Sequence, residues 1–221
     1  MEKQVLVIFP HPDDEAFGTA GLMTKFINEG VPVTYACATL GEMGRNMGNP
    51  FFATRETLPE VRKKELKDAC QAMGVNDLRM LGFRDKTLEF EDPELLVSTF
   101  SKLVDELKPS LVITFYPGYG IHPDHDACGA AVVEAIRRLP ASDRPTLYTL
   151  PITPDRESVL GKPDKVFDVT DVLDTKIKTI EAHRSQTEAM VARLDDGSLD
   201  PNSDIMTFIK QESFWIYPFD E

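Results

Sequence analysis

Residues 5–15 read Val-Leu-Val-Ile-Phe-Pro-His-Pro-Asp-Asp-Glu. Five consecutive apolar residues with β-branched members are typical of a strand that is buried on both faces. The polar residues that follow open a helical pattern from about Glu15 to Asn28, and Gly30 is a natural helix end. A buried strand that leads directly into a helix predicts a parallel sheet covered by helices.

The same alternation continues along the chain. Further strands are predicted at 31–39, 78–83, 111–115 and 147–152, and further helices at 60–73, 93–107, 127–138 and 172–193. This order predicts an α/β fold: a Rossmann-like, doubly wound, mostly parallel sheet with helices on both faces, as one domain over residues 1–221. Two stretches lie outside the alternation. Residues 40–59 are rich in Gly, Asn and Pro and form a long, functional or mobile connection, and residues 195–204 form a second exposed loop.

The composition narrows the choice of partners and compartment. Lys and Arg total 24 and Asp and Glu total 37, which gives a net charge of −13. That charge argues against nucleic acid or an anionic membrane as the main partner, although a small anionic ligand needs only a few arginines. The three cysteines are an odd number without a C-x-x-C pair, and no apolar run reaches the length of a signal-peptide core or a membrane span. We therefore expect a cytoplasmic protein without disulfides, and the sequence leaves open whether it is a homo-oligomer.

Three of the four histidines lie in two strand-to-helix turns. His11 follows the first strand, and His122 and His125 follow the fourth. In the common strand order 3-2-1-4-5 these two strands are neighbours, and ligands bind beyond their carboxyl ends. We therefore expect His11, Asp13 and Asp14 to meet the two histidines of the second turn in one compact site.

Imidazole and carboxylate groups together suit zinc and similar divalent ions. A catalytic zinc takes three protein ligands and keeps one position open, and His11, one Asp and one His from the second turn would fill that set. The remaining Asp and His are then available for proton transfer. Each residue alone also has a structural interpretation, because Asp caps helices and Pro begins them, but five such residues in two adjacent turns favour a metal site.

Motifs for other site types are missing from the sequence. No G-x-G-x-x-G follows the first strand, and neither a G-x-x-x-x-G-K-[ST] loop nor a G-x-S-x-G elbow occurs. A dinucleotide site, a P-loop and a serine hydrolase are therefore disfavoured.

The motifs His-Pro-Asp-Asp-Glu at 11–15 and His-Pro-Asp-His at 122–125 resemble those of the LmbE-like, or PIG-L, family of zinc-dependent N-acetylglucosaminyl deacetylases. Further similarity lies at 39–42, 62–66 and 182–186, so the resemblance extends over most of the chain. Within the family, the sequence is most similar to deacetylases of bacillithiol biosynthesis. That resemblance implies an N-deacetylase whose substrate is a small N-acetylated sugar conjugate, N-acetylglucosaminyl malate.

The resemblance also implies roles for the site residues. It assigns one Zn²⁺ per chain to three ligands, His11, Asp14 and His125, and Fe²⁺ can occupy comparable sites. Asp13 would be the general base. His122, in its protonated form, would stabilise the oxyanion and protonate the leaving amine, and Asp124 would orient His122.

Residues for substrate binding are expected mainly in the 40–59 connection. Glu42 could accept hydrogen bonds from sugar hydroxyls, and an arginine could bind a carboxylate such as malate through its planar fork. The candidates are Glu42, Arg45, Asn46, Arg55, Arg62 and Tyr119. In related deacetylases a Tyr before the second motif moves into the site, but here one extra residue separates Tyr119 from that motif. His183 is expected to pack structurally, with support of the site as the alternative.

Three other functions stay open at this point. The same metal could cleave the amide of a thiol-sugar S-conjugate, which a comparison of substrates would reveal. A metallophosphoesterase would use two metals bridged by carboxylate, whereas the pattern supplies ligands for one. A non-enzymatic metal-binding module would have a closed site, and the presence of Asp13 and His122 beside the ligands argues against it.

Overall fold

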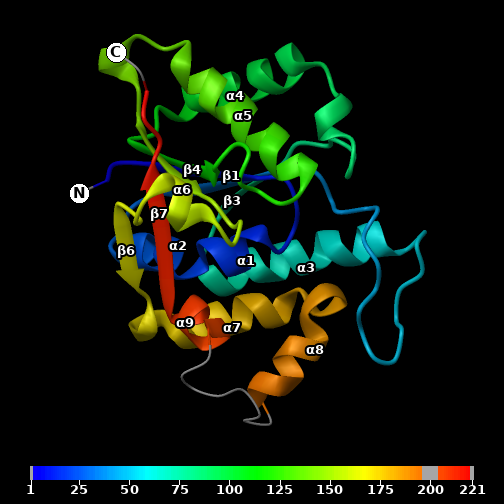
Figure 1. The fold of residues 1–221 in the computed structure, drawn as a ribbon. Coiled ribbons are helices and arrows are strands. Elements are labelled where there is room, and N and C mark those ends of the chain that lie inside the picture. The colour runs from blue at the N-terminus through cyan, green and yellow to red at the C-terminus, as the bar shows by residue number, and fades with distance from the viewer. Residues whose placement is uncertain (1, 196–203, 220–221) are drawn as a thin grey trace.

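The computed structural model describes residues 2–195 and 204–219, which fold around one seven-stranded sheet (Figure 1). The strands are β1 (Val5–Phe9), β2 (Val33–Cys37), β3 (Asp77–Met80), β4 (Leu111–Phe115), β5 (Thr146–Leu150), β6 (Lys165–Asp168) and β7 (Gln211–Ile216). They lie in the order β3-β2-β1-β4-β5-β7-β6. The first five follow the predicted order and pair in parallel, which confirms the doubly wound α/β fold.

Helices cover both faces of the sheet. They are α1 (Asp14–Gly18), α2 (Ala20–Asn28), α3 (Leu58–Met73), α4 (Pro93–Leu107), α5 (Pro123–Arg137), α6 (Arg156–Leu160), α7 (Leu173–Ala182), α8 (Arg184–Asp195) and α9 (Asp204–Lys210), with short 3-10 turns at Leu88–Phe90, Ala141–Asp143 and Thr170–Val172. Helices α4 and α5 lie on one face, and α1, α2 and α3 on the other, with α7 packed beneath α2 and α3 (Figure 1).

Strand β1 shows why both faces must be covered. Its five residues are all fully buried, and alternate side chains enter two separate cores. Val5, Val7 and Phe9 pack toward α2 and α3, whereas Leu6 and Ile8 pack toward α4 and α5. Because side chains alternate across a strand, this uninterrupted apolar run is explained by a central position in the sheet.

Two predicted helices are each broken into two. The helix expected at 15–28 stops at Thr19, and α2 begins there with its Gly21 and Leu22 N–H groups donating to the Glu212 carboxylate at 2.8 Å each. The helix expected at 172–193 stops at His183, and the Ser185 N–H at the start of α8 donates to Glu65 at 2.7 Å. In both cases a buried glutamate from a distant element satisfies the free N–H groups of a new helix start.

The carboxyl-terminal part of the sheet was not predicted. Strand β7 pairs antiparallel with β5, and β6 pairs antiparallel with β7 at the sheet edge. The connection predicted at 40–59 is irregular up to Thr57, and residues 196–203 of the loop predicted at 195–204 lie outside the described part of the chain. The three cysteines are free and buried, as expected. Among the described residues, no helix combines the length and apolar character needed to cross a membrane.

Candidate metal centre and active site

The two turns that carry the histidines meet at the carboxyl ends of β1 and β4. These strands are adjacent and parallel, and the helices that follow them cover opposite faces of the sheet. His11 lies in the turn after β1, Asp14 begins α1, and His125 lies in the first turn of α5. The predicted meeting of the two turns at the switch point is therefore observed.

Three side chains converge there. His11 Nδ1 lies 3.2 Å from His125 Nε2 and 3.6 Å from Asp14 Oδ2, and His125 Nε2 lies 3.3 Å from Asp14 Oδ1. A further contact fixes the position of the Asp14 carboxylate, because its Oδ2 accepts the His11 backbone N–H at 2.8 Å. Ring stacking of His125 on Phe115, with centroids 4.0 Å apart, holds the second imidazole.

The hydrogen bonds of the two rings identify the kind of ligand that fits. His125 Nδ1 lies 2.7 Å from the Gly120 carbonyl oxygen, which can only accept, so this nitrogen carries the hydrogen. His11 Nε2 lies 3.1 Å from Asp124 and 3.2 Å from Asp85, so it donates to carboxylates. In neutral rings, His11 Nδ1 and His125 Nε2 then present lone pairs to each other and to a carboxylate. These two nitrogens and the carboxylate face one another with no hydrogen between them, which a bound cation explains. Two imidazole nitrogens and a carboxylate are ligands that suit a divalent metal.

The Asp124 carboxylate contacts the ring of His11, whereas the Asp124 backbone N–H donates to the ring of His122. Its fully buried carboxylate accepts from the backbone N–H groups of Lys86 at 2.7 Å and Leu88 at 3.1 Å, besides contacting His11. Burial acts to raise the pKa of Asp124, but the hydrogen bonds from His11 and Lys86 hold that pKa below its usual value. Asp124 thus orients His11, as carboxylates behind metal-bound imidazoles commonly do, and the expected orientation of His122 by this carboxylate is replaced.

His122 caps helix α5 at the edge of the site. Its Nδ1 accepts the backbone N–H of Asp124 at 3.1 Å, so the neutral ring carries its hydrogen on Nε2. One of its ring nitrogens lies within 4.8 Å of those of His11 and His125. Burial, together with these two rings, lowers the pKa of His122, which favours the neutral ring over the protonated form expected from the sequence.

Asp13 occupies a strained position next to the ligands. Its backbone φ of 102° lies in the left-handed region, which costs a non-glycine residue on the order of 1–3 kcal/mol. The Asp13 N–H donates to Glu15 Oε2 at 3.1 Å, and Arg62 donates to Asp13 Oδ2 at 3.1 Å. Burial raises the pKa of Asp13 to about 6, although the charge of Arg62 opposes the shift. A carboxylate with a pKa near neutrality is suited to act as a general base.

Arg62 supports this turn, and its role in binding substrate stays a prediction. Only 4% of the residue is exposed, and its guanidinium also donates to the backbone oxygens of Pro12 and Gly41. Gly41 has a φ of +64°, and a Cβ there would lie 1.7 Å from Arg62 Nη1. The glycine therefore permits the close approach by which Arg62 fixes Asp13.

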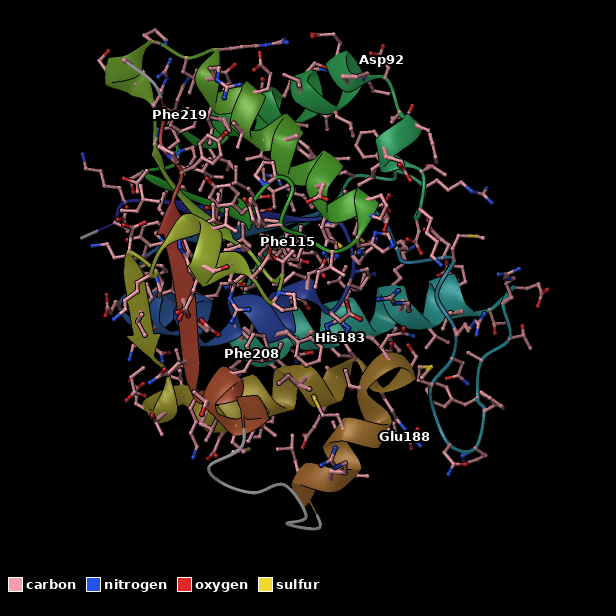
Figure 2. All side chains as sticks on the ribbon, in the orientation of Figure 1. Asp92, Phe115, His183, Glu188, Phe208 and Phe219 are labelled. Atoms are coloured by element: carbon pink, nitrogen blue, oxygen red, sulfur yellow. The ribbon has the colours of Figure 1, made fainter. Side chains whose placement is uncertain are left out.

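A buried layer of polar residues lies beneath the site, and only part of it was predicted from the sequence. His183, at the junction of α7 and α8 in Figure 2, is fully buried with its Nε2 2.5 Å from Glu15 Oε1. Glu15 also accepts the Tyr35 hydroxyl at 2.9 Å. The roles of Glu15 and Asp85 were not predicted from the sequence. Glu15 belongs to the first motif and could have been found there, whereas nothing in the sequence around Asp85 indicates contact with His11.

A cavity of about 730 Å³ opens onto the metal ligands, with Asp14 and His125 among its lining residues. Its remaining walls come from the end of β5 and the start of α6, and from α9 and β7. Phe115 and Phe208, both labelled in Figure 2, line it from β4 and α9 respectively.

The substrate-binding role of the predicted residues stays a prediction, and these residues lie outside the cavity. None of Glu42, Arg45, Asn46, Arg55 and Tyr119 is among the lining residues of this cavity. Arg45 and Arg55 are exposed. Glu42 accepts the backbone N–H of Asp85 at 3.0 Å, and the Tyr119 carbonyl accepts those of Ile152 and Thr153. This cavity is therefore bounded by β5, α9 and β7 and not by the 40–59 connection.

Known proteins resemble this chain over its whole length. A protein of Bacillus subtilis (strain 168), described as probable N-acetyl-α-D-glucosaminyl L-malate deacetylase 2, is 54% identical over 222 residues, which cover 100% of both chains. A diacetylchitobiose deacetylase of Thermococcus kodakarensis is 31% identical over 195 residues, covering 83% of this chain and 70% of its own. The solved structure of N,N'-diacetylchitobiose deacetylase from Pyrococcus horikoshii superposes with a TM-score of 0.75 at 27% identity, covering 98% of this chain and 84% of that one.

The family model for PIG-L, GlcNAc-PI de-N-acetylase, matches residues 6–136, a span that contains both histidine turns. The resemblance found from the two motifs is therefore confirmed. By this match, by the full-length similarity and by the shared fold, the chain belongs to the PIG-L family of deacetylases.

Proposed function

We propose that this protein removes the N-acetyl group of N-acetyl-α-D-glucosaminyl L-malate by metal-dependent hydrolysis, releasing acetate and the free amine. The observation that carries the proposal is the convergence of His11 Nδ1, His125 Nε2 and the Asp14 carboxylate next to a cavity of about 730 Å³, which Asp14 and His125 help to line. The name of the 54% identical relative supports this choice of substrate, which is also the one that the resemblance to deacetylases of bacillithiol biosynthesis implies.

We assign one Zn²⁺ to His11, Asp14 and His125, with Fe²⁺ as the other metal suited to these ligands. When bound, the ion would supply Lewis-acid polarisation of the acetyl carbonyl and of water. A second ion on His11, Asp85 and Asp124 is disfavoured, because Asp124 already accepts two backbone N–H groups and a ring N–H. One metal per chain argues against the metallophosphoesterase alternative.

Asp13 is the general base of this reaction. Arg62 occupies its Oδ2, and its backbone is fixed by Glu15, so the carboxylate is held in place to accept a proton from the attacking water. Once protonated, Asp13 can return that proton to the departing amine.

His122 donates a hydrogen bond from Nε2–H to the acetyl oxygen as negative charge develops there. Such a donor is worth about 3–4 kcal/mol in comparable sites. A neutral ring cannot give up this hydrogen without forming an imidazolate. The lowered pKa of His122 therefore favours Asp13 over His122 as the proton donor to the amine, in contrast to the role expected from the sequence.

The domain organisation, partners, location and oligomeric state of the protein are also proposals. The strands β5, β7 and β6 continue the sheet beyond the matched residues 6–136, which supports one domain over 1–221. The net charge of −13 supports a small-molecule substrate and a cytoplasmic location without nucleic-acid or membrane partners. Homo-oligomerisation stays a hypothesis, which a measurement of the protein's mass in solution would test.

The test is acetate release from a panel of N-acetylated substrates, with metal content measured on the same preparation. We expect the malate conjugate to have the highest kcat/KM, with about one Zn or Fe per chain. Faster cleavage of an amide in a thiol-sugar S-conjugate would overturn the substrate proposal. Two metals per chain with phosphatase activity would overturn the reaction class.

A further inference from the structure

Arg156 lies where a third strand meets the site. Strand β5 is parallel to β4, so its carboxyl end lies at the same edge of the sheet as the metal ligands. The chain after β5 is tied to the second histidine turn, because the backbone N–H groups of Ile152 and Thr153 donate to the Tyr119 carbonyl at 2.8 and 3.2 Å. Arg156 begins α6 directly afterwards and lines the same cavity as Asp14 and His125.

The charge of Arg156 is unusual for this cavity. It is the only Lys or Arg among the cavity-lining residues in the described part of the chain. Its Nη1 donates to the Thr153 carbonyl at 3.1 Å, and no carboxylate of a described residue forms an ion pair with it. Glu212, an acid on the same cavity, is already paired with the buried Lys176 at 2.7 Å. In a protein with a net charge of −13, a cavity arginine without an acidic partner retains donors for an anionic ligand.

We propose that Arg156 is the specificity-determining residue that binds a carboxylate of the substrate's aglycone, an inference that rests on the proposed function. The acetyl group lies at Asp14 and His125, and the sugar spans the cavity of about 730 Å³ toward α6. The guanidinium then meets an α-hydroxy-acid carboxylate in a two-point, charge-assisted contact.

The other arginines considered for this role are less suitable. Arg62 uses its guanidinium on Asp13, Pro12 and Gly41. Arg45 and Arg55 are exposed and do not line the cavity. Arg156 combines a place in the cavity with donors that are not engaged by protein carboxylates.

The experiment compares two substrates that differ only in charge at the aglycone. N-acetyl-α-D-glucosaminyl L-malate and methyl N-acetyl-α-D-glucosaminide are assayed by acetate release with wild type, Arg156→Gln and Arg156→Lys. The matched control is Arg137→Gln, which removes an exposed arginine paired with Glu134 on α5. We expect Arg156→Gln to lower kcat/KM for the malate conjugate roughly 10- to 100-fold, mainly through KM, because a hydrogen-bonded charge is lost.

The neutral glycoside should be cleaved by Arg156→Gln within about 2-fold of wild type, which also shows that the variant is folded. Arg156→Lys should recover part of the loss, since it restores the charge but not the planar fork. Equal effects of Arg156→Gln on both substrates, or no effect on either, would overturn the role of Arg156. If wild type itself shows no preference for the malate conjugate, the proposed function fails instead, and the two failures are distinguishable.

Discussion

The two histidine turns and the cavity wall opposite them are built differently. In the turns, nearly every polar side chain has a fixed partner: Asp124 on two backbone N–H groups, His125 on Gly120, Asp13 on Arg62. The wall from β5, α6, α9 and β7 mixes apolar side chains such as Leu150, Ile152 and Trp215 with polar ones such as Arg156 and Gln211. This difference supports the proposal that the turns act on the acetamide group, whereas the wall contacts the rest of the substrate.

The largest effects should come from the turn after β1. Asp13→Ala should keep the metal and lower kcat about 10²- to 10⁴-fold on every substrate, because the general base is gone. His11→Ala should lose both metal and activity, because a ligand is gone. Metal analysis alongside acetate release checks both variants. Full activity in Asp13→Ala would remove the proposed base.

Substitutions at His122 test whether this residue acts in the reaction as a hydrogen-bond donor or as an acid. His122→Ala should retain the metal and lower kcat about 10²- to 10³-fold, the usual loss for one oxyanion donor. His122→Gln keeps an N–H donor and should recover part of kcat. If Gln recovers nothing while Ala retains the metal, the ring acts as an acid, and the role expected from the sequence is restored.

A substitution at Asp124 tests whether this carboxylate strengthens metal binding by orienting His11. Asp124→Asn should weaken metal affinity about 10- to 100-fold, because His11 Nε2–H loses its charged acceptor. Titration with a competing chelator measures the affinity, and saturating metal should restore most of the activity. Asp105→Asn, an exposed acid paired with Lys108 on α4, is the control. Unchanged affinity in Asp124→Asn would show that His11 is oriented by other contacts.

The smallest effects should come from the connection after β2. Arg45→Ala and Arg55→Ala should each change kcat/KM less than about 3-fold, because both side chains are exposed and outside the cavity. A comparison of the malate conjugate with a neutral glycoside checks this. A selective loss of the malate conjugate in either variant would move substrate selection from the wall to this connection.

Much of the parallel part of the fold could be predicted because its signals are local. The buried runs at β1 and β4 and the polar turns after them are contiguous in the sequence, and the parallel fold rules place these turns together. The breaks at Thr19 and His183 could not be predicted, because the carboxylates that satisfy the new helix starts, Glu212 and Glu65, come from distant elements.

The sequence by itself determined the fold class, the meeting of His11, Asp14 and His125, and the family, because the strands and the turns after them are local signals and the rules of parallel folds bring the two turns together. Only the tertiary structure decided what surrounds them. It directed Asp124 to His11, buried Arg62 beneath Asp13, and closed the cavity with β7 and Arg156. These contacts join residues far apart in the chain, and their partners are set by packing and burial, which no local pattern records.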